Sequence, residues 1–198
     1  MNSSDTDKKD IVLRLNDIQK SFGSVTILSD VNLSIVKGET VVILGRSGTG
    51  KSVILKCIIG LLRPDSGSVE LFGQQFLNLS EKEENKLRIK IGFLFQSGAL
   101  YDSMTVRQNL EFPIIRQPDY KKSDLSPKVI EQLKNVGLEE SIDKVPSELS
   151  GGMQKRIGLA RTLMLDLQII LYDEPTTGLD PFTSNEISHL ILSMQNKY

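Results

Sequence analysis

Apolar and polar residues follow two different patterns along this chain. Residues 11–15 and 31–35 alternate apolar with polar side chains, which is typical of strands with one solvated face. Residues 41–44, 91–95 and 168–172 are instead continuous apolar runs. Such runs are typical of buried strands in a parallel sheet. The first part of the chain is therefore predicted to form antiparallel strands, and the later runs a parallel sheet.

Helical patterns separate these strands. Helices are predicted at residues 51–62, 80–87 and 181–197, and a further strand at 68–72. The section from about 97 to 164 is helical by pattern, with one helix that begins at Pro127 and is closed by Gly137. Alternating strands and helices predict an α/β fold with a mainly parallel sheet. An N-terminal antiparallel β subdomain and an inserted helical lobe complete the predicted architecture.

Composition limits the class of protein. Of 198 residues, 39% are apolar and 25% charged, and this apolar fraction is enough for a folded core. One domain is predicted over residues 11–198, after a polar tail at 1–10. A net charge of −1 argues against a nucleic-acid partner. The single cysteine, Cys57, excludes an internal disulfide. The longest apolar stretch, at 53–62, is too short to span a bilayer, so any membrane pore must come from another chain.

A glycine-rich segment links the apolar run at 41–44 to the next predicted helix. It fits G-x-x-x-x-G-K-[ST] at every fixed position, and the strand–loop–helix context favours a phosphate loop over a plain glycine turn. In such loops backbone N–H groups and a helix N-terminus face phosphate oxygens. Lys51 is expected to reach the β- and γ-phosphates, and Ser52 to ligate Mg²⁺. The predicted ATP-binding residues are Gly45, Arg46, Ser47, Gly48, Thr49, Gly50, Lys51 and Ser52.

Two carboxylates follow the apolar strand at residues 169–172. Ligands of open α/β sheets bind at the carboxyl ends of the strands. We expect Asp173 to hold Mg²⁺ through water and Glu174 to polarise the attacking water. Two solvated acids at a strand end are the alternative. Together with the phosphate loop, the pair indicates a nucleoside triphosphatase.

The segment at residues 149–156, Leu-Ser-Gly-Gly-Met-Gln-Lys-Arg, indicates the class of nucleoside triphosphatase. It resembles the signature loop of the ATP-binding cassette (ABC) family, and the resemblance runs from about Ile11 to the end of the chain. Ser150 and the amides of Gly151 and Gly152 form a second anion site at a helix start, or an ordinary helix N-cap. The resemblance implies that this site serves the ATP of a second subunit, in a head-to-tail homodimer. Met153 stands where many family members have Gln.

The resemblance also assigns roles to three further residues. It implies that Phe22 stacks on adenine, that Gln96 touches Mg²⁺ or the attacking water, and that Asp180 lies at the dimer interface. A core phenylalanine, a polar strand end and a solvated loop acid are the respective alternatives. The loop after Gln96 would transmit the ATP cycle to a membrane permease, contacted near residues 97–110.

The only histidine, His189, lies among apolar neighbours on the last predicted helix. The switch histidine of the ABC family follows a later strand, so His189 is interpreted as a structural or surface residue. The final core strand and the switch-histidine region are absent from the 198 residues. A binding-only fragment is therefore one alternative to an active ATPase.

Two short stretches resemble one subgroup, the Mla-type ATPases of bacterial phospholipid transport. They are residues 94–110, which include Leu-Phe-Gln-Ser-Gly-Ala-Leu-Tyr, and residues 146–153. The resemblance implies a cytoplasmic ATPase subunit, peripheral on the inner face of the bacterial inner membrane. Another ABC importer or exporter is the nearest alternative. A soluble ABC ATPase acting on DNA ends or ribosomes is disfavoured by the single cassette and the compact lobe.

Overall fold

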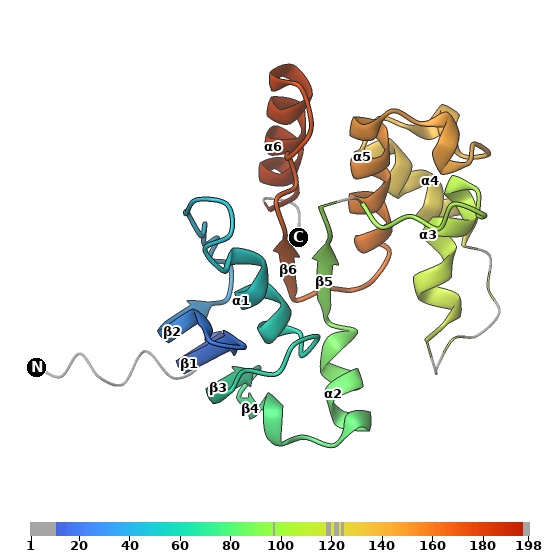
Figure 1. The fold of residues 1–198 in the computed structure, drawn as a ribbon. Helices are drawn as coiled ribbons and strands as arrows, with labels where there is room; N and C mark the ends of the chain where they lie inside the picture. The colour runs from blue at the N-terminus through green and yellow to red at the C-terminus, as the bar shows by residue number, and fades with distance from the viewer. Residues whose placement is uncertain (1–10, 97, 118–119, 121–122, 124, 196–198) are drawn as a thin grey trace, which may run out of the picture. The chain divides into compact units, whose positions relative to one another are not determined.

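A computed structural model describes residues 11–96, 98–117, 120, 123 and 125–195 (Figure 1). The predicted tail at 1–10 and Ser97 of the loop after Gln96 lie outside these residues. The chain divides into two compact units, unit 1 up to Arg88 and unit 2 from Ile89. Each unit is described by itself.

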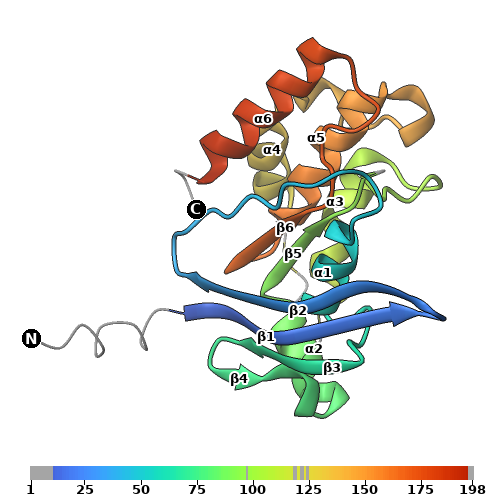
Figure 2. The ribbon, with the colours of Figure 1, turned by 60° about the vertical axis from the view of Figure 1, so that its left-hand side comes forward.

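An antiparallel sheet forms most of unit 1. Its strands are β1 (Ile11–Phe22), β2 (Val25–Val36), β3 (Ser66–Leu71) and β4 (Gln74–Gln75), in the order β2-β1-β3-β4 (Figure 2). Leu13, Leu15 and Ile18 of β1 are almost completely buried, so the alternating pattern turns one face of the strand towards the core. The predicted antiparallel strands are present, and both are longer than the alternating stretches.

A two-residue loop joins β1 to β2. Phe22 pairs with Val25, and Gly23 between them has a φ of 60°. A tight hairpin needs left-handed backbone at its turn, which glycine adopts without steric cost. The turn therefore fixes Phe22 at the tip of the hairpin, where half of its surface is exposed.

Two short helices complete unit 1. They are α1 (Lys51–Ile58) and α2 (Glu81–Arg88), and a 3₁₀ turn, η1 (Phe76–Asn78), precedes α2. Helix α1 ends four residues before the predicted end at Leu62, since Gly60 takes a left-handed φ of 68°. Arg63 and Arg88 both bind the buried carboxylate of Glu84, at 3.0 and 2.6 Å, which ties α2 to the segment after α1.

The predicted strand at residues 41–44 is wrong for this structure. These residues have no strand pairing, and Val42 and Leu44 are 72% and 88% exposed. A buried strand needs neighbours that satisfy its N–H and C=O groups. In the described part of the chain, the parallel sheet contains only β5 and β6. The apolar side chains of these residues favour a buried strand, but a strand also needs neighbouring strands to pair with.

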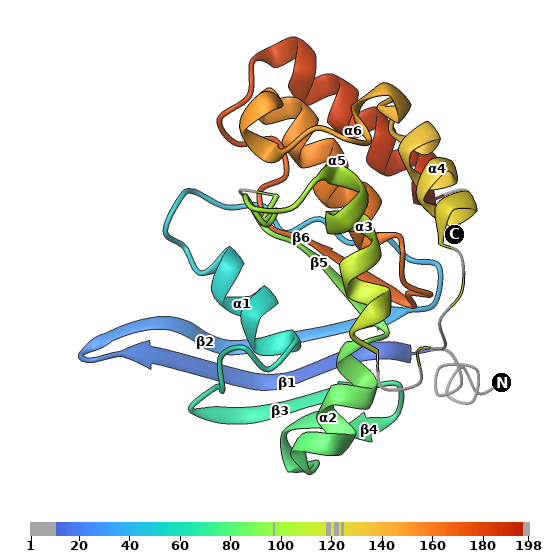
Figure 3. The same cartoon turned by 90° about the vertical axis from the view of Figure 1, so that its right-hand side faces the viewer.

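Unit 2 is built on a parallel strand pair with helices around it (Figure 3). Strand β5 (Ile91–Leu94) pairs with β6 (Ile169–Tyr172) in parallel register. Between them in sequence lie α3 (Val106–Ile115), α4 (Ser126–Asn135), η2 (Glu139–Ser141), η3 (Pro146–Glu148) and α5 (Gly151–Thr162), and α6 (Pro181–Gln195) follows β6. Helices α3, α4 and α5 fall within the section from about 97 to 164 that is helical by pattern, and α6 begins where the final helix is predicted.

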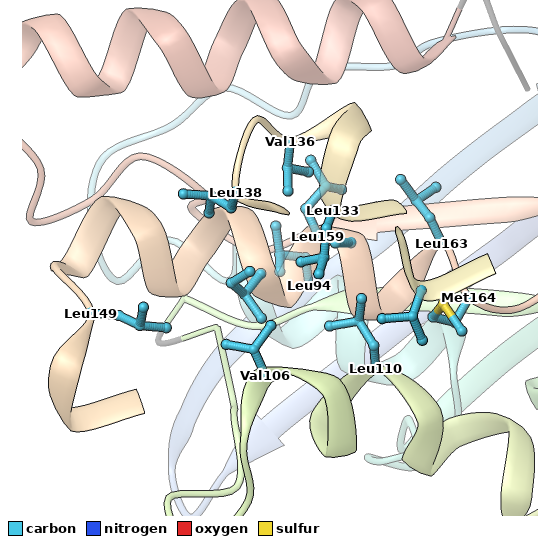
Figure 4. Close-up of a cluster of buried hydrophobic side chains, with 13 residues drawn as sticks. Leu94, Val106, Leu110, Leu133, Val136, Leu138, Leu149, Leu159, Leu163 and Met164 are labelled. Atoms are coloured by element: carbon cyan, nitrogen blue, oxygen red, sulfur yellow. The ribbon is translucent and has the colours of Figure 1, made fainter. Parts of the chain in front are cut away.

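One apolar cluster holds the helices of unit 2 together (Figure 4). Val106 and Leu110 of α3, Leu133 of α4 and Leu159 of α5 are completely buried in it. Helix α5 packs against α3, α4, β5 and α6. It is therefore the central helix of this unit, and a shift of α5 would displace β5 and the three helices packed against it.

The predicted fold class is confirmed. Along the chain, an antiparallel sheet precedes a parallel strand pair with helices. Among the residues that the structure describes, no helix is both long and apolar enough to cross a membrane.

Candidate functional site

The phosphate loop lies in unit 1, between the unpaired segment at 41–44 and α1. It closes as a turn in which the Thr49 hydroxyl donates to the Arg46 carbonyl at 2.8 Å. Gly48 and Gly50 have φ values of 81° and 95°, in the left-handed region that glycine tolerates. A Cβ on Gly45 would lie 2.7 Å from the Thr49 hydroxyl oxygen. The glycines of the motif are thus required by the shape of the loop itself.

Lys51, the first residue of α1, folds back over this loop. Its Nζ donates to the carbonyl oxygens of Gly45 at 3.0 Å and Arg46 at 2.9 Å. The ammonium therefore lies against the loop, next to the first backbone amides of α1. Ser52 follows Lys51 in the first turn of this helix. A positive charge and a helix N-terminus at one place favour an anion.

The hairpin of β1 and β2 lies beside the phosphate loop. A Cβ on Gly50 would lie 2.9 Å from side-chain atoms of both Ile27 and Leu28, so the loop ends in close contact with β2. Phe22, at the tip of the same hairpin, is half exposed and does not belong to the core. The Lys20 Nζ lies 5.7 Å from the centre of its ring. The exposed ring face is compatible with the predicted stacking on a base.

The two strands of unit 2 end at the same edge of their sheet. Leu94 is opposite Tyr172 in the parallel register, and the ladder continues as the Asp173 amide donates to the Leu94 carbonyl at 3.0 Å. Gln96 and Asp173 therefore both follow the carboxyl end of a strand at this edge, with Asp173 8% exposed and Gln96 open to solvent. Burial raises the pKa of Tyr172, the last residue of β6, to about 12.

Glu174 has an unusual backbone. Its φ is 46°, in the left-handed region, which costs a residue with a Cβ about 1–3 kcal/mol. Its carboxylate Oε2 accepts from the Thr177 hydroxyl at 3.0 Å, and its carbonyl accepts from the Thr177 amide at 3.2 Å. The turn that follows the strand therefore holds both the backbone and the carboxylate of Glu174, in a conformation common at functional sites.

The signature segment forms the start of α5. Ser150 caps the helix, and its hydroxyl accepts from the Met153 amide at 3.3 Å. This is the helix N-cap that was the plainer interpretation of the segment, and it leaves the first amides of the helix facing outward as an anion site requires. Gly151 is exposed, whereas a Cβ on Gly152 would lie 2.5 Å from the Thr183 side chain of α6. The close approach of α6 therefore explains the glycine at 152, whereas Gly151 lies at the exposed start of the helix.

Asp180 begins α6. Its Oδ1 accepts from the Thr183 amide at 3.0 Å, and hydrogen bonds from the side chain and the backbone of Thr183 lower the pKa of Asp180. It is therefore a helix cap in the single chain, a role that sequence reasoning did not assign. His189, also on α6, is exposed.

Three residues around the site have contacts that sequence reasoning missed. The Nζ of Lys155 donates to the Thr177 carbonyl, in the turn after Glu174. The Arg161 guanidinium donates to the Ala99 carbonyl at 2.7 Å, and Asn109 binds backbone groups of residues 101–105. Charged residues on the apolar side of a predicted helix were the available signal for the first two. Asn109 had no comparable signal.

The structure groups the predicted residues by unit. Unit 1 carries the phosphate loop and Phe22, and unit 2 carries Gln96, Asp173, Glu174, the signature residues and Asp180. Of these, the edge of the β5–β6 sheet brings together Gln96 and the two carboxylates. Ser52, Gln96 and Asp173 offer a hydroxyl, an amide and a carboxylate oxygen, which are the hard donors that suit Mg²⁺.

Comparison with known proteins gives a consistent result. A sequence model of the family described as ABC transporter matches residues 28–177. The probable ribonucleotide transport ATP-binding protein mkl of Mycobacterium bovis is 48% identical over 184 residues, which are 93% of this chain and 51% of that protein. The chloroplastic protein TRIGALACTOSYLDIACYLGLYCEROL 3 of Arabidopsis thaliana is 43% identical over 192 residues, 93% of this chain and 55% of that protein. The chain thus spans about half the length of the curated relatives it matches.

Solved structures also resemble the chain over most of its length. The dimeric ATP-binding cassette MJ0796, in a post-hydrolysis state bound to ADP and Pi, superposes with a TM-score of 0.84 at 35% identity. The match covers 93% of this chain and 83% of that cassette.

Proposed function

Because this chain belongs to the ABC transporter family, we propose that it is the ATP-binding and ATP-hydrolysing subunit of an ABC transporter. The observation that supports hydrolysis most directly is the shared edge of β5 and β6, where Gln96, Asp173 and Glu174 follow two paired strands. The phosphate loop of unit 1, with Lys51 over its carbonyls, supports ATP binding.

In the proposed mechanism the phosphate loop and Lys51 hold the β- and γ-phosphates, and Phe22 stacks on adenine. Ser52, Asp173 and Gln96 would hold Mg²⁺, which when bound would offset the negative charge of the phosphates. Glu174 accepts a hydrogen bond from the water that attacks the γ-phosphorus. The water oxygen forms a bond to that phosphorus and gives up a proton to Glu174. The bond from the phosphorus to the bridging oxygen breaks, and ADP leaves with the electron pair.

The proposed active form is a head-to-tail homodimer with two ATP molecules between the subunits. In it, Ser150, Gly151 and Gly152 of one subunit contact the γ-phosphate held by the phosphate loop of the other, and Asp180 lies near the interface. The exposed Ser150 and Gly151 at the start of α5 support this arrangement, because a partner can reach them. The solved cassette MJ0796, which resembles this chain, is described as dimeric.

The hydrolytic role of Glu174 is tested by phosphate release from the 198-residue chain with Mg²⁺-ATP. Glu174→Gln keeps the size of the side chain but removes its negative charge, so phosphate release should fall by about 10²-fold or more, with ATP binding retained. Glu186→Gln, at an exposed position of α6, is the matched control and should not change the rate. Equal phosphate release by wild type and Glu174→Gln would instead support a binding-only fragment.

The proposed transporter moves phospholipids and carries this subunit on the cytoplasmic face of the inner membrane. The stretches at 94–110 and 146–153 support it, as does the Arabidopsis relative, whose name contains that of a galactolipid. The proposed permease contact is near residues 97–110. Exposed Tyr101, whose ring is tilted against that of Phe112 with ring centres 4.6 Å apart, offers an aromatic surface there.

The substrate and the partner are tested by purification from membranes. Recovery of a multispanning permease and a lipid-binding protein supports phospholipid transport. A permease with a solute-binding protein for nucleotides would favour the substrate in the name of the mycobacterial relative. Recovery of ribosomes or DNA in place of any permease would overturn the transporter proposal.

A further inference from the structure

Lys155 occupies an unusual position for a lysine. It lies in α5, five residues after Ser150, and only 6% of its surface is exposed. Burying an ammonium is costly unless it is hydrogen-bonded or paired. Its Nζ donates to the Thr177 carbonyl at 2.5 Å. Burial lowers the pKa of Lys155, and the negative charge of Glu174 opposes that shift, so the carboxylate lies within electrostatic reach of the ammonium.

Thr177 is also the residue that holds Glu174. Its hydroxyl donates to Glu174 Oε2 at 3.0 Å, and its amide donates to the Glu174 carbonyl at 3.2 Å. Lys155 therefore binds the third polar group of the same residue. The carboxylate of Glu174 is connected to the signature helix through a single intermediate, Thr177.

Three residues of α5 on one side of the helix lie against the segments that follow β5 and β6. Gly151, Lys155 and Gly158 are four and three residues apart, a spacing that places them on one side of a helix. A Cβ on Gly151 would lie 3.8 Å from Leu179, and one on Gly158 would lie 2.8 Å from the Gly98 carbonyl. Lys155 is the residue of this face that makes a charged hydrogen bond to the turn carrying Glu174.

We propose that Lys155 is a positioning residue for Glu174, which ties the helix that begins at the signature to the turn that bears the hydrolytic carboxylate. This inference rests on the proposed role of Glu174. In the proposed dimer, the signature of a subunit contacts its partner's ATP, whereas Glu174 acts on the subunit's own ATP. Lys155 thereby links the two nucleotide sites within one chain.

The kinetic test compares three variants of the 198-residue chain. Lys155→Met keeps the length and removes the donor, so kcat for ATP hydrolysis should fall about 10- to 100-fold while KM for ATP changes less than about twofold. Lys155→Arg keeps a charged donor and should recover most of the lost kcat. Lys134→Met is the matched control, because Lys134 is exposed on α4, and it should behave like wild type.

Amide hydrogen exchange provides a readout that does not depend on turnover. Without nucleotide, Lys155→Met should speed exchange of the Thr177 and Leu179 amides, which bond to the Glu174 and Thr176 carbonyls, and Lys134→Met should not. If Lys155→Met does not fold, Lys155→Gln, with a shorter donor, takes its place and should show an intermediate kcat.

The outcomes separate this inference from the proposed function. A wild-type chain without any ATP hydrolysis would overturn the proposed function, and the exchange data alone would then decide whether Lys155 holds the turn. Wild-type exchange in Lys155→Met overturns the inference. A lower kcat in Lys155→Met that Lys155→Arg fails to restore also overturns the inference. The same holds if KM rises by the same factor as kcat falls, since either result indicates a general loss of structure.

Discussion

At the residue scale, the glycines of α5 and its neighbouring loop determine how closely two segments approach. The backbone of Gly98 crosses α5 at Gly158, where there is no space for a side chain. Next to this crossing, Ala99 has a left-handed φ of 49°, and its carbonyl accepts from Arg161. The loop that follows Gln96 is therefore attached to the signature helix by a backbone contact and a charged hydrogen bond.

Replacing Gly158 tests this close approach. Gly158→Ala would place a Cβ 2.8 Å from the Gly98 carbonyl oxygen, so we expect a loss of about 1–3 kcal/mol in the free energy of unfolding. Gly151→Ala is the control in the same helix, because its Cβ meets only Leu179 at 3.8 Å. Alanine favours helix, so this control should be neutral or slightly stabilising. Urea unfolding measures both, and equal losses would contradict a steric origin.

At the element scale, the end of β1 is fixed by a carboxylate from another part of unit 1. Asp65, just before β3, accepts from the Lys20 Nζ at 2.5 Å and from the Ser21 amide at 2.7 Å. Both bonds favour the charged carboxylate, and that from Lys20 is the larger cause of the lowered pKa of Asp65. The strand is thus held one residue before Phe22, whose ring is proposed to stack on adenine.

The stability of this contact should depend on pH in the acid range. Because the folded pKa of Asp65 is below its usual value of about 3.9, its contribution is complete above that value and is lost as pH falls through the lowered pKa. Asp65→Asn should therefore be less stable than wild type at pH 7, and the difference should narrow at pH 3. Urea unfolding at both pH values measures it. If Lys20→Met and Asp65→Asn were fully additive at pH 7, the two residues would not be coupled.

At the scale of the whole molecule, the proposed dimer places each ATP between two chains. The phosphate loop and the signature belong to different units of one chain, and Ser150 and Gly151 of the signature are exposed at the start of α5. If each site takes its signature from the partner, damage to one motif can be complemented by a second copy that retains it. A site formed within one chain cannot be repaired in this way.

Mixing two inactive variants distinguishes these arrangements. Lys51→Ala damages the phosphate loop, and Ser150→Arg damages the signature, so each variant alone should show almost no ATP hydrolysis. In a mixed dimer, the phosphate loop of the second variant meets the signature of the first, which restores one of two sites. Random pairing predicts roughly a quarter of wild-type activity, measured as phosphate release from an equimolar mixture. Activity no higher than that of the separate variants would contradict sites shared between chains.

The sequence alone determined the motifs and most of the elements beside them. The required glycines, the lysine after them and the two acids after an apolar run are local patterns. Within them, Gly48, Gly50 and Glu174 have the left-handed backbone of tight turns. The strands at 91–95 and 168–172 were also predictable, because their apolar runs are short and have turns on both sides. The similar run at 41–44 was predicted as a strand in the same way and is unpaired, since pairing depends on neighbours that a local pattern does not contain.

Only the tertiary structure decided which of these residues lie together. The parallel register of β5 and β6 brings Gln96 to the same sheet edge as Asp173 and Glu174, although 76 residues separate Gln96 from the nearer of the two acids. The burial of Lys155 and its bond to the Thr177 carbonyl likewise depend on how α5 packs against the turn after β6. Sequence patterns indicate the secondary structure and the burial that each residue favours. Contacts between distant residues follow from the packing of whole elements, which those patterns do not encode individually.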